Sequence, residues 1–244
     1  MALRDSLGAV RFRYAPEVLS RFPGLRGGVL LARGVRNGPA PPELAQAFRA
    51  EQEAVRRRLG ETPLSEIASL AAWRRAFAAF GVKPTQYRSA AEALLRRLTK
   101  KGEVPPVNLL TDLGNLVSIR YALPVAVLDA RGVAGAITVR FAAGGEPFVE
   151  LDAQEPSPPE PGEVIFVDDA GQVHARRWCW RQSAPSGVRE DTREVLVTVE
   201  GHHAGAQADV AAALGDLEAF LGRHAGGAVQ SGLLSPACPE FRAQ

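Results

Sequence analysis

The stretch from residue 105 to residue 152 constrains the fold of this chain most strongly. It opens on two prolines, and polar residues repeatedly interrupt its apolar runs. A polar-apolar segment spans 108–118, and strand-like runs follow at 125–128 and 136–141. The interrupting residues favour the wall of a pocket over a plain core; they are Asn108, Asp112, Asn115, Ser118, Asp129, Arg140 and Glu146.

The rest of the chain mixes helix-like and strand-like segments without a regular strand–helix–strand alternation. Apolar spacing and capping residues predict helices over 41–59, 66–80, 90–100 and 204–223. Alternating or β-branched runs predict strands over 9–14, 28–35, 147–151, 164–167 and 194–200. This mixture predicts an α+β fold in which mixed β-sheets are flanked by helices.

We expect a single folded unit over residues 1–224. Its N-terminal strands and helices occupy 1–83, and the central part of the fold occupies 84–200. The last twenty residues, 225–244, are rich in Gly, Pro and Ser, which predicts a loosely attached tail.

Composition and charge exclude several classes of protein. With 29 basic and 27 acidic residues the net charge is +2, so the chain as a whole is not polybasic and we expect no DNA partner. No apolar run reaches the roughly 18 residues that span a bilayer, and the first residues lack the apolar core of a signal peptide. We therefore expect a cytoplasmic protein with no membrane partner.

The cysteines and histidines predict no metal site. Cys179 and Cys238 are far apart, and only His202 and His203 are adjacent among the four histidines. These positions match no zinc-ligand spacing, and no glycine motif for phosphate or dinucleotide binding is present. We expect neither a metal nor another cofactor.

Two of the expected helices end on basic residues. The residues are Arg56, Arg57 and Arg58 in the helix over 41–59, and Arg96, Arg97, Lys100 and Lys101 in and after the helix over 90–100. Such a cluster can contact phosphates, but cations also suit the C-terminal end of a helix dipole on an ordinary solvated surface. Both interpretations stay open at this point.

A series of short motifs runs through residues 84–200. An N-x-x-x-D-x-x-N-x-x-S motif begins at Asn108, and a Leu-Pro pair and Asp129 follow it. An I-x-V-R-x-A-x-x-G-E-x-F-x-x-L-D motif then runs from Ile137 to Asp152, and a Ser-Gly-Val motif begins at Ser186. In this order the motifs resemble the tRNA-editing (B3/B4) domain of the phenylalanyl-tRNA synthetase beta subunit, most closely its free-standing copies.

The resemblance implies a phenylalanyl-tRNA synthetase beta-like editing fold that hydrolyses the ester of a mischarged tRNA. Its implied partner is the aminoacylated acceptor end, and the amino acid is unknown. Four polar editing residues of the synthetase domain are absent, since the aligned positions hold Pro105, Gly114, Ala126 and Ala184. Either the pocket recognises a different amino acid, or the domain binds without hydrolysis.

Seven polar residues are candidates for a substrate-binding site. Asn108 and Asn115 can orient a water or an ester carbonyl. A polar triplet follows Trp178 and Trp180, whose spacing predicts an extended segment with both rings on one face. For Asn115 and the residue on the Gly-Gly corner, the alternative is a hydrogen bond that holds a turn. The set is Arg88, Asn108, Asn115, Glu146, Arg181, Gln182 and Ser183, and no catalytic residue is assigned.

Three functional hypotheses remain. The first is an aminoacyl-tRNA deacylase that acts in trans, with the tRNA against the basic helix ends. The second is a non-catalytic module that binds tRNA, another RNA or an amino acid on the same scaffold. The third is a small-molecule enzyme that reuses the pocket. The first two predict a deep pocket with a basic rim, lined by Asn108, Asn115 and Arg181.

Overall fold

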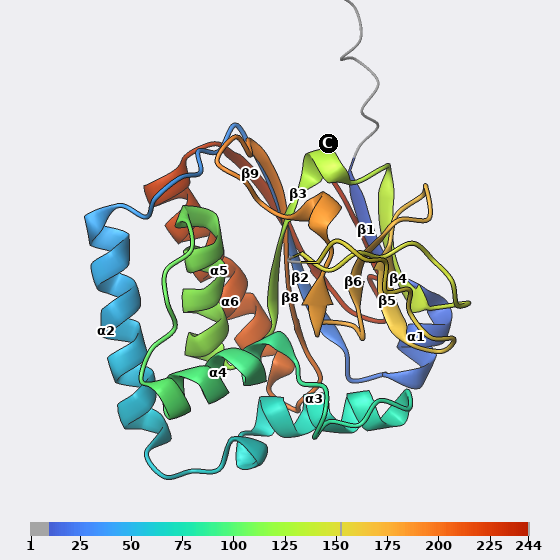
Figure 1. The fold of residues 1–244 in the computed structure, drawn as a ribbon, viewed down its shortest axis with the longest axis horizontal. Coiled ribbons are helices and arrows are strands. Elements are labelled where there is room, and N and C mark those ends of the chain that lie inside the picture. The colour runs from blue at the N-terminus through green and yellow to red at the C-terminus, as the bar shows by residue number, and fades with distance from the viewer. Residues whose placement is uncertain (1–9, 152, 244) are drawn as a thin grey trace, which may run out of the picture.

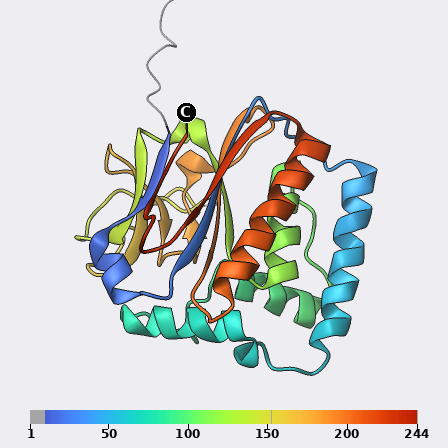
Figure 2. The ribbon, with the colours of Figure 1, turned by 180° about the vertical axis from the view of Figure 1, so that it is seen from behind.

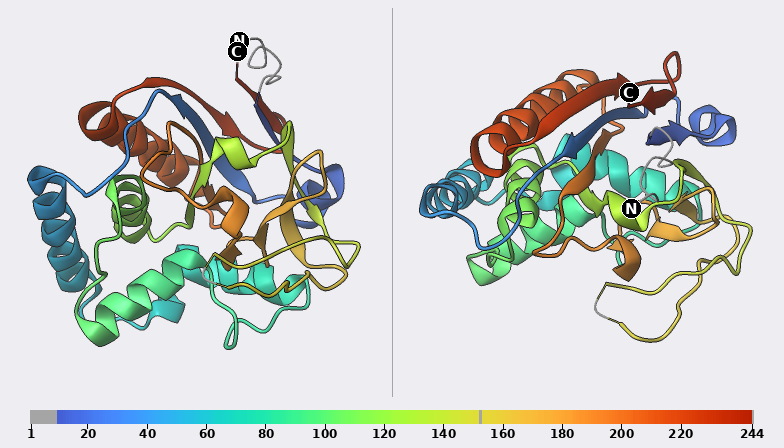
Figure 3. Two further views of the ribbon diagram at one scale, coloured as in Figure 1. Left: turned by 45° about the horizontal axis from the view of Figure 1, so that its top comes forward. Right: turned by 90° about the horizontal axis from the view of Figure 1, so that it is seen from above.

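Two β-sheets and a layer of helices make up the fold. The computed structural model describes residues 10–151 and 153–243. Residue 9 of the expected first strand and Asp152 of the long motif lie outside the described residues. Most of the helices gather on one face of the first sheet, and the second sheet covers the other face (Figure 1; Figure 3).

The first sheet has four antiparallel strands in the order β3–β8–β2–β9. They are β2 Arg26–Arg33, β3 Val125–Asp129, β8 Glu194–Gly201 and β9 Ala228–Leu234. The two central strands, β2 and β8, are buried along almost their whole length. Their apolar runs follow from this position, because layers cover both faces of the sheet.

The second sheet has six strands in the order β10–β1–β4–β5–β6–β7. They are β1 Arg11–Tyr14, β4 Ala136–Phe141, β5 Val164–Val167, β6 Val173–Arg176, β7 Arg181–Gln182 and β10 Glu240–Arg242. Strands β1 and β4 pair in parallel and the other pairs are antiparallel. The predicted α+β fold with mixed sheets is therefore confirmed.

Six α-helices lie in the part of the chain that the structure describes. They are α1 Pro16–Arg21, α2 Pro42–Leu59, α3 Ala68–Ala79, α4 Ala90–Lys101, α5 Leu109–Tyr121 and α6 Ala206–Phe220. The predicted cap of α4 is confirmed, since the Ser89 side chain accepts a hydrogen bond from the backbone N–H of Glu92. Gly102 ends this helix in the left-handed conformation, which costs glycine little.

Alternation along β2 divides the core into two parts. Leu30 and Ala32 face the helices and pack with residues of α2, α4, α5 and α6. Val29 and Leu31 point to the opposite side and pack between the two sheets with Phe12, among others. Because successive strand residues face opposite ways, one strand contributes to both parts.

The prediction of a loose C-terminal tail was wrong. Strand β9 pairs with β2 along its whole length, and β10 pairs with β1. Figure 2 shows β9 and α6 on the near side of the molecule. The segment was misread because β9 is an edge strand with mostly half-exposed or exposed residues, and its glycines Gly226 and Gly227 form the preceding turn at positive φ. Its backbone groups nevertheless complete the sheet edge.

The strand expected over 147–151 was also wrong. In its place the chain forms two isolated bridges, from Val149 to Pro156 and from Glu150 to Ser183. Phe148 of this loop is buried against Ile165, Val167 and Val173, so the loop packs on the second sheet and does not extend it.

Candidate functional site

A pocket of about 80 Å³ opens between the two sheets at the start of α4. Both sheets and the loop between β6 and β7 contribute to its walls, so residues distant in sequence meet there. Most of the lining is apolar. The lining residues are Ala90, Pro124, Val125, Ala126, Phe166, Ala175, Trp178, Cys179, Trp180, Arg181, Gln182, Thr198 and Glu200.

A tight turn shapes the pocket wall between β6 and β7. Arg177 and Trp178 have φ values of 45° and 62°, the left-handed region that bulky residues seldom adopt. The backbone N–H of Trp178 donates to the carbonyl of Val164. The prediction of an extended segment was therefore wrong: Trp178 is fully buried, whereas Trp180 is half-buried at the pocket mouth.

Glu200 is the acidic residue of the pocket, and only 2% of it is exposed. Its Oε1 atom accepts hydrogen bonds from the Tyr14 hydroxyl at 2.8 Å and from the Trp178 indole N–H at 3.1 Å. Its Oε2 atom accepts no hydrogen bond from any residue that the structure describes. One carboxylate oxygen is thus held in place by two neutral donors, and the other makes no hydrogen bond within the described chain.

Burial dominates the electrostatics of Glu200. Removal from water raises the pKa of this carboxyl to about 7, although the hydrogen bonds from Trp178 and Tyr14 favour the charged form. Burial and the nearby Glu200 charge also hold the pKa of the Tyr14 hydroxyl well above its usual range. Tyr14 therefore stays a donor, and Glu200 can exchange a proton near neutral pH.

Cys179 lines the same pocket, but its thiol is a weaker candidate for a reactive group than the Glu200 carboxyl. Burial and the negative charge of Glu200 raise the pKa of this thiol well above its usual value. The thiol is protonated at neutral pH, and a protonated thiol is a poor nucleophile. Of the groups in the pocket, Glu200 is therefore the better placed for proton transfer.

Arginines and aromatic rings form the rim. The side chain of Arg181 is 54% exposed, stacks over the Trp180 ring at 5.1 Å and pairs with Glu150 at 3.5 Å. Arg177 lies over the same ring at 4.6 Å and over Tyr87 at 4.0 Å. Because Arg177 already pairs with Glu163 at 3.0 Å, Arg181 is the rim guanidinium whose charge is exposed to a ligand.

Only two of the seven candidate residues line the pocket, Arg181 and Gln182. Gln182 donates to the carbonyls of Val127 at 3.0 Å and Ser186 at 2.8 Å, so its amide ties strand β7 to β3. Ser183 is fully buried, with its hydroxyl 3.3 Å from that of Ser186. It lies behind the pocket wall rather than in it.

The two asparagines lie outside the pocket lining. Asn108 caps α5, since its side chain accepts from the backbone N–H of Thr111 at 3.0 Å. Asn115 is half-buried on the same helix, and its side chain makes no hydrogen bond to a described residue. The expected pocket with Arg181 is present, but its expected asparagines are not part of it. A substrate contact by either asparagine stays a prediction.

The last two candidates hold local structure. Arg88 pairs with Glu92 at 3.6 Å and donates to the carbonyl of Thr85 at 2.7 Å. Glu146 accepts from the backbone N–H groups of Ala143 and Gly144 and from Arg140, all within 2.9 Å. These bonds agree with the alternative interpretation of Glu146 as a turn residue, and neither residue lines the pocket.

The positions that lack the expected polar residues have structural explanations. Ala126 lines the pocket, and its small side chain leaves the space open. Gly114 lies against β3, where an added Cβ would stand 2.8 Å from a methyl carbon of Val127. Ala184 begins a short 3₁₀ turn, Ala184–Ser186. The close approach of α5 to β3 thus leaves little room for a side chain at position 114.

Within 10–151 and 153–243, no three His, Cys, Asp or Glu residues group in a way that would hold a metal ion. Among the described helices, none has both the length and the apolar character required to cross a bilayer.

Comparison with known proteins places this site in a family. The B3/4 domain model matches residues 72–215, a range that includes the whole pocket lining. The phenylalanine–tRNA ligase beta subunit of Bradyrhizobium diazoefficiens is 35% identical over 106 residues, which are 43% of this chain and 13% of the relative. The beta subunit of Mesorhizobium japonicum is 30% identical over 138 residues, or 57% of this chain and 17% of the relative.

A solved structure gives a weaker likeness. An N-terminal fragment of the phenylalanyl-tRNA synthetase beta subunit from Pyrococcus horikoshii aligns with a TM-score of 0.48 and 15% identity, covering 93% of this chain and 52% of that fragment. The chain spans less than a fifth of the length of the two bacterial ligase subunits. Because the family model matches more than half of its residues, the chain belongs to the B3/4 domain family.

Proposed function

We propose that this protein hydrolyses the ester bond of mischarged aminoacyl-tRNA, acting in trans on the 3′ end. Its bacterial relatives are beta subunits of phenylalanine–tRNA ligases, which supports a tRNA-related role. The observation that carries the proposal is the Glu200 carboxyl, which has one oxygen without a partner and a pKa of about 7 inside an apolar pocket.

Glu200 is proposed as the general base. With the aminoacyl group in the pocket, Oε2 accepts a proton from a water as the water oxygen attacks the ester carbonyl. The tetrahedral intermediate then breaks its bond to the ribose oxygen, and Glu200 returns the proton to that oxygen. The products are the free amino acid and uncharged tRNA. A base whose pKa lies near the working pH suits this exchange.

Other pocket residues have supporting roles. The apolar walls exclude bulk water and receive the amino-acid side chain. Tyr14 and Trp178 donate hydrogen bonds to Oε1, which fixes the orientation of the carboxyl group and therefore the position of Oε2. Arg181 at the rim contacts the ribose-phosphate of the 3′ end.

A non-catalytic module that binds tRNA or an amino acid is the second candidate. The observation that favours it is the loss of polar editing residues at Pro105, Gly114, Ala126 and Ala184. Such a module would use the same pocket and rim but would not depend on the protonation of Glu200 for turnover.

A panel of tRNAs mischarged with radiolabelled amino acids separates the two candidates. We expect at least one pair to be deacylated faster than in buffer, and Glu200→Gln to reduce this rate by about 100-fold or more. In the native protein the rate should rise as pH increases through about 7 and level off above it, because Glu200 is then almost entirely in its base form.

Glu146→Gln is the matched control, since that carboxylate lies outside the pocket. Circular dichroism establishes that both variants fold. If no pair is cleared faster than in buffer while the protein still retains tRNA on a filter, the second candidate replaces the first. Full activity in Glu200→Gln would remove Glu200 from the mechanism.

A further inference from the structure

The C-terminal halves of α2 and α4 converge on one groove. Glu53, Arg56, Arg57 and Gly60 line it from α2 and the residue that follows, and Thr99 lines it from α4. Helical spacing adds further cations to the two walls. Arg49 lies one turn or two before the lining residues of α2, whereas Arg96 and Lys100 lie beside Thr99 on α4.

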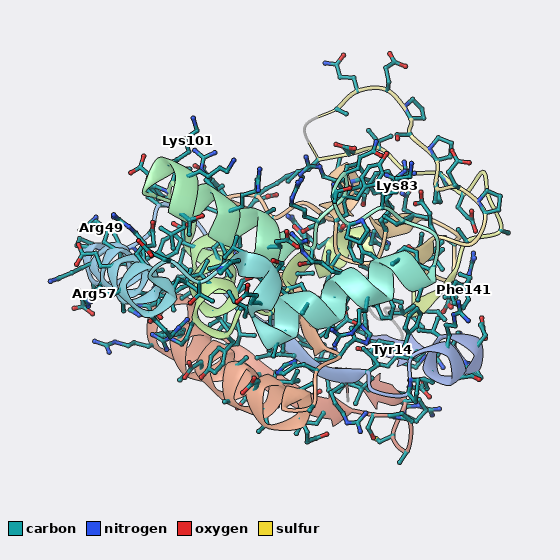
Figure 4. The ribbon with its side chains drawn as sticks, turned by 90° about the horizontal axis from the view of Figure 1, so that it is seen from below. Tyr14, Arg49, Arg57, Lys83, Lys101 and Phe141 are labelled. Atoms are coloured by element: carbon teal, nitrogen blue, oxygen red, sulfur yellow. The ribbon has the colours of Figure 1, made fainter. Side chains whose placement is uncertain are left out.

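We call this surface the basic groove and define it by five exposed cations. Arg56 and Arg57 line the groove, and Arg49, Arg96 and Lys100 flank its lining on the same two helices. Figure 4 shows Arg49 and Arg57 at the same side of the molecule as Lys101 at the end of α4, far from Lys83 and Phe141. Positive charge gathers at the C-terminal halves of both helices. The helix dipole favours cations only in the last turn, and Arg49 lies well before it.

The charges of the basic groove are not neutralised within the described chain. None of its five side chains forms an ion pair with a described residue, and Glu53 is the acidic residue in its lining. Elsewhere on the surface, Arg120, Arg131 and Arg242 each pair with nearby carboxylates. The basic groove therefore keeps an excess positive field that can attract an anionic partner.

The basic groove and the pocket lie at opposite ends of α4. Ala90, the first residue of this helix, lines the pocket, and Thr99 near its end lines the groove. Twelve helical residues rise about 18 Å. A nucleic-acid strand whose end enters the pocket can thus follow α4 and place its phosphates in the basic groove.

We propose that the basic groove binds the phosphate backbone of the tRNA whose 3′ end enters the pocket. This inference rests on the proposed function and adds the surface that holds the body of the substrate. Arginine recognises phosphate through paired donors, and four of the five cations are arginines. The exposed large apolar side chains of the described residues, Val107, Leu151 and Leu233, all lie outside α2 and α4, which argues against a lipid surface.

Two double variants test the proposal, Arg56→Gln with Arg57→Gln and Arg96→Gln with Lys100→Gln. The control is Arg75→Gln with Arg189→Gln, which removes two exposed charges elsewhere. Each variant is assayed with full-length aminoacyl-tRNA and with a short aminoacylated oligonucleotide that ends in CCA. Circular dichroism and thermal midpoints verify folding.

Each groove variant should raise the KM for aminoacyl-tRNA roughly tenfold at low salt and leave the short substrate and the control unchanged. In filter retention of tRNA, the slope of log affinity against log salt should fall by about 1.5, as expected for two lost phosphate contacts. Equal losses on both substrates would overturn the proposal, as would unchanged tRNA retention. Groove-dependent binding to vesicles of phosphatidylserine and phosphatidylcholine without a tRNA effect would also overturn it.

The outcomes distinguish this inference from the proposed function. If the native protein hydrolyses neither substrate but the groove variants still lose tRNA retention and salt dependence, the basic groove stands and the deacylase proposal fails. If hydrolysis of both substrates is normal in the groove variants and retention is unchanged, the deacylase proposal stands and the groove fails.

Discussion

Two buried carboxylates lie near the turn at residues 177–180, and the chain holds them in opposite ways. Glu163 pairs with Arg176 at 2.8 Å and with Arg177 at 3.0 Å. Glu200 receives only neutral donors, from Tyr14 and from Trp178, the residue next to Arg177. The turn and the residue before it therefore supply two guanidinium groups to Glu163 and one indole N–H to Glu200.

The difference explains their separate roles. A buried carboxylate with two arginines has its charge neutralised, so it serves as a structural tie. A buried carboxylate with neutral donors keeps the cost of burial, which raises the pKa of Glu200 to about 7 and makes the group able to exchange protons. Four predictions test this contrast, from the largest effect to the smallest.

The largest effect is expected for Glu163→Ala. This change leaves Arg176, which is only 3% exposed, without its charge partner, and we expect the free energy of unfolding to fall by about 3–5 kcal/mol. Urea titration measures the loss, and the exposed Glu160→Ala should change stability by less than about 0.5 kcal/mol. A loss below about 1 kcal/mol would show that Glu163 is not a structural tie.

In contrast to Glu163→Ala, Glu200→Gln is expected to raise the free energy of unfolding. Since the folded pKa of about 7 lies above the ordinary 4.5, the contribution of Glu200 to native stability is fully present below pH 4.5 and is lost as pH rises through about 7. The pKa difference corresponds to about 3 kcal/mol, so Glu200→Gln should be more stable than the native protein by that amount at pH 8. Thermal and urea unfolding of both proteins from pH 4 to 8 measure this difference. If stability varied with pH in the variant as it does in the native protein, Glu200 would not be the titrating group.

A smaller effect, on activity alone, is expected when the pocket is filled. Ala126→Leu adds three carbon atoms to the lining of a pocket of about 80 Å³. We expect kcat/KM for the best aminoacyl-tRNA to drop about 10- to 100-fold, with stability changed by less than about 1.5 kcal/mol. Ala143→Leu, at an exposed position outside the pocket, is the control. Undiminished turnover in Ala126→Leu would place the reaction elsewhere.

The smallest effect is expected for Glu146→Gln. This carboxylate holds the backbone of residues 143 and 144 and pairs with Arg140, but it does not line the pocket. We expect a stability loss of about 1 kcal/mol and no change in kcat/KM. A marked loss of activity in a stable variant would return Glu146 to the substrate-binding site.

Local patterns predicted most of the secondary structure. Helical spacing and the Ser89 cap placed α2, α3 and α4 within a few residues of their bounds, and β-branched runs placed β5 and β8. Edge strand β9 was missed, because its side chains are mostly exposed and its pairing comes from a distant partner, β2. The residue preferences that predict a strand reflect side-chain packing and burial, and the side chains of an edge strand are less buried than those of a central strand.

The candidate site was harder to predict than the fold. Arg181 and Gln182 were identified beside the tryptophans, and both line the pocket. Glu200 was read only as the end of an apolar strand, although Thr198 and Glu200 are two residues apart and therefore share one strand face. That alternation was the signal available for finding the acidic residue.

The sequence by itself determined the order of the elements and the motifs that match the B3/4 family, because both depend on residues close together in the chain. Only the tertiary structure decided which carboxylate faces the pocket and how it titrates. Its donors Tyr14 and Trp178 lie 186 and 22 residues away, and a left-handed turn that no local pattern predicts aims one of them. Burial and hydrogen bonding set the pKa of Glu200, and both arise from contacts across the two sheets.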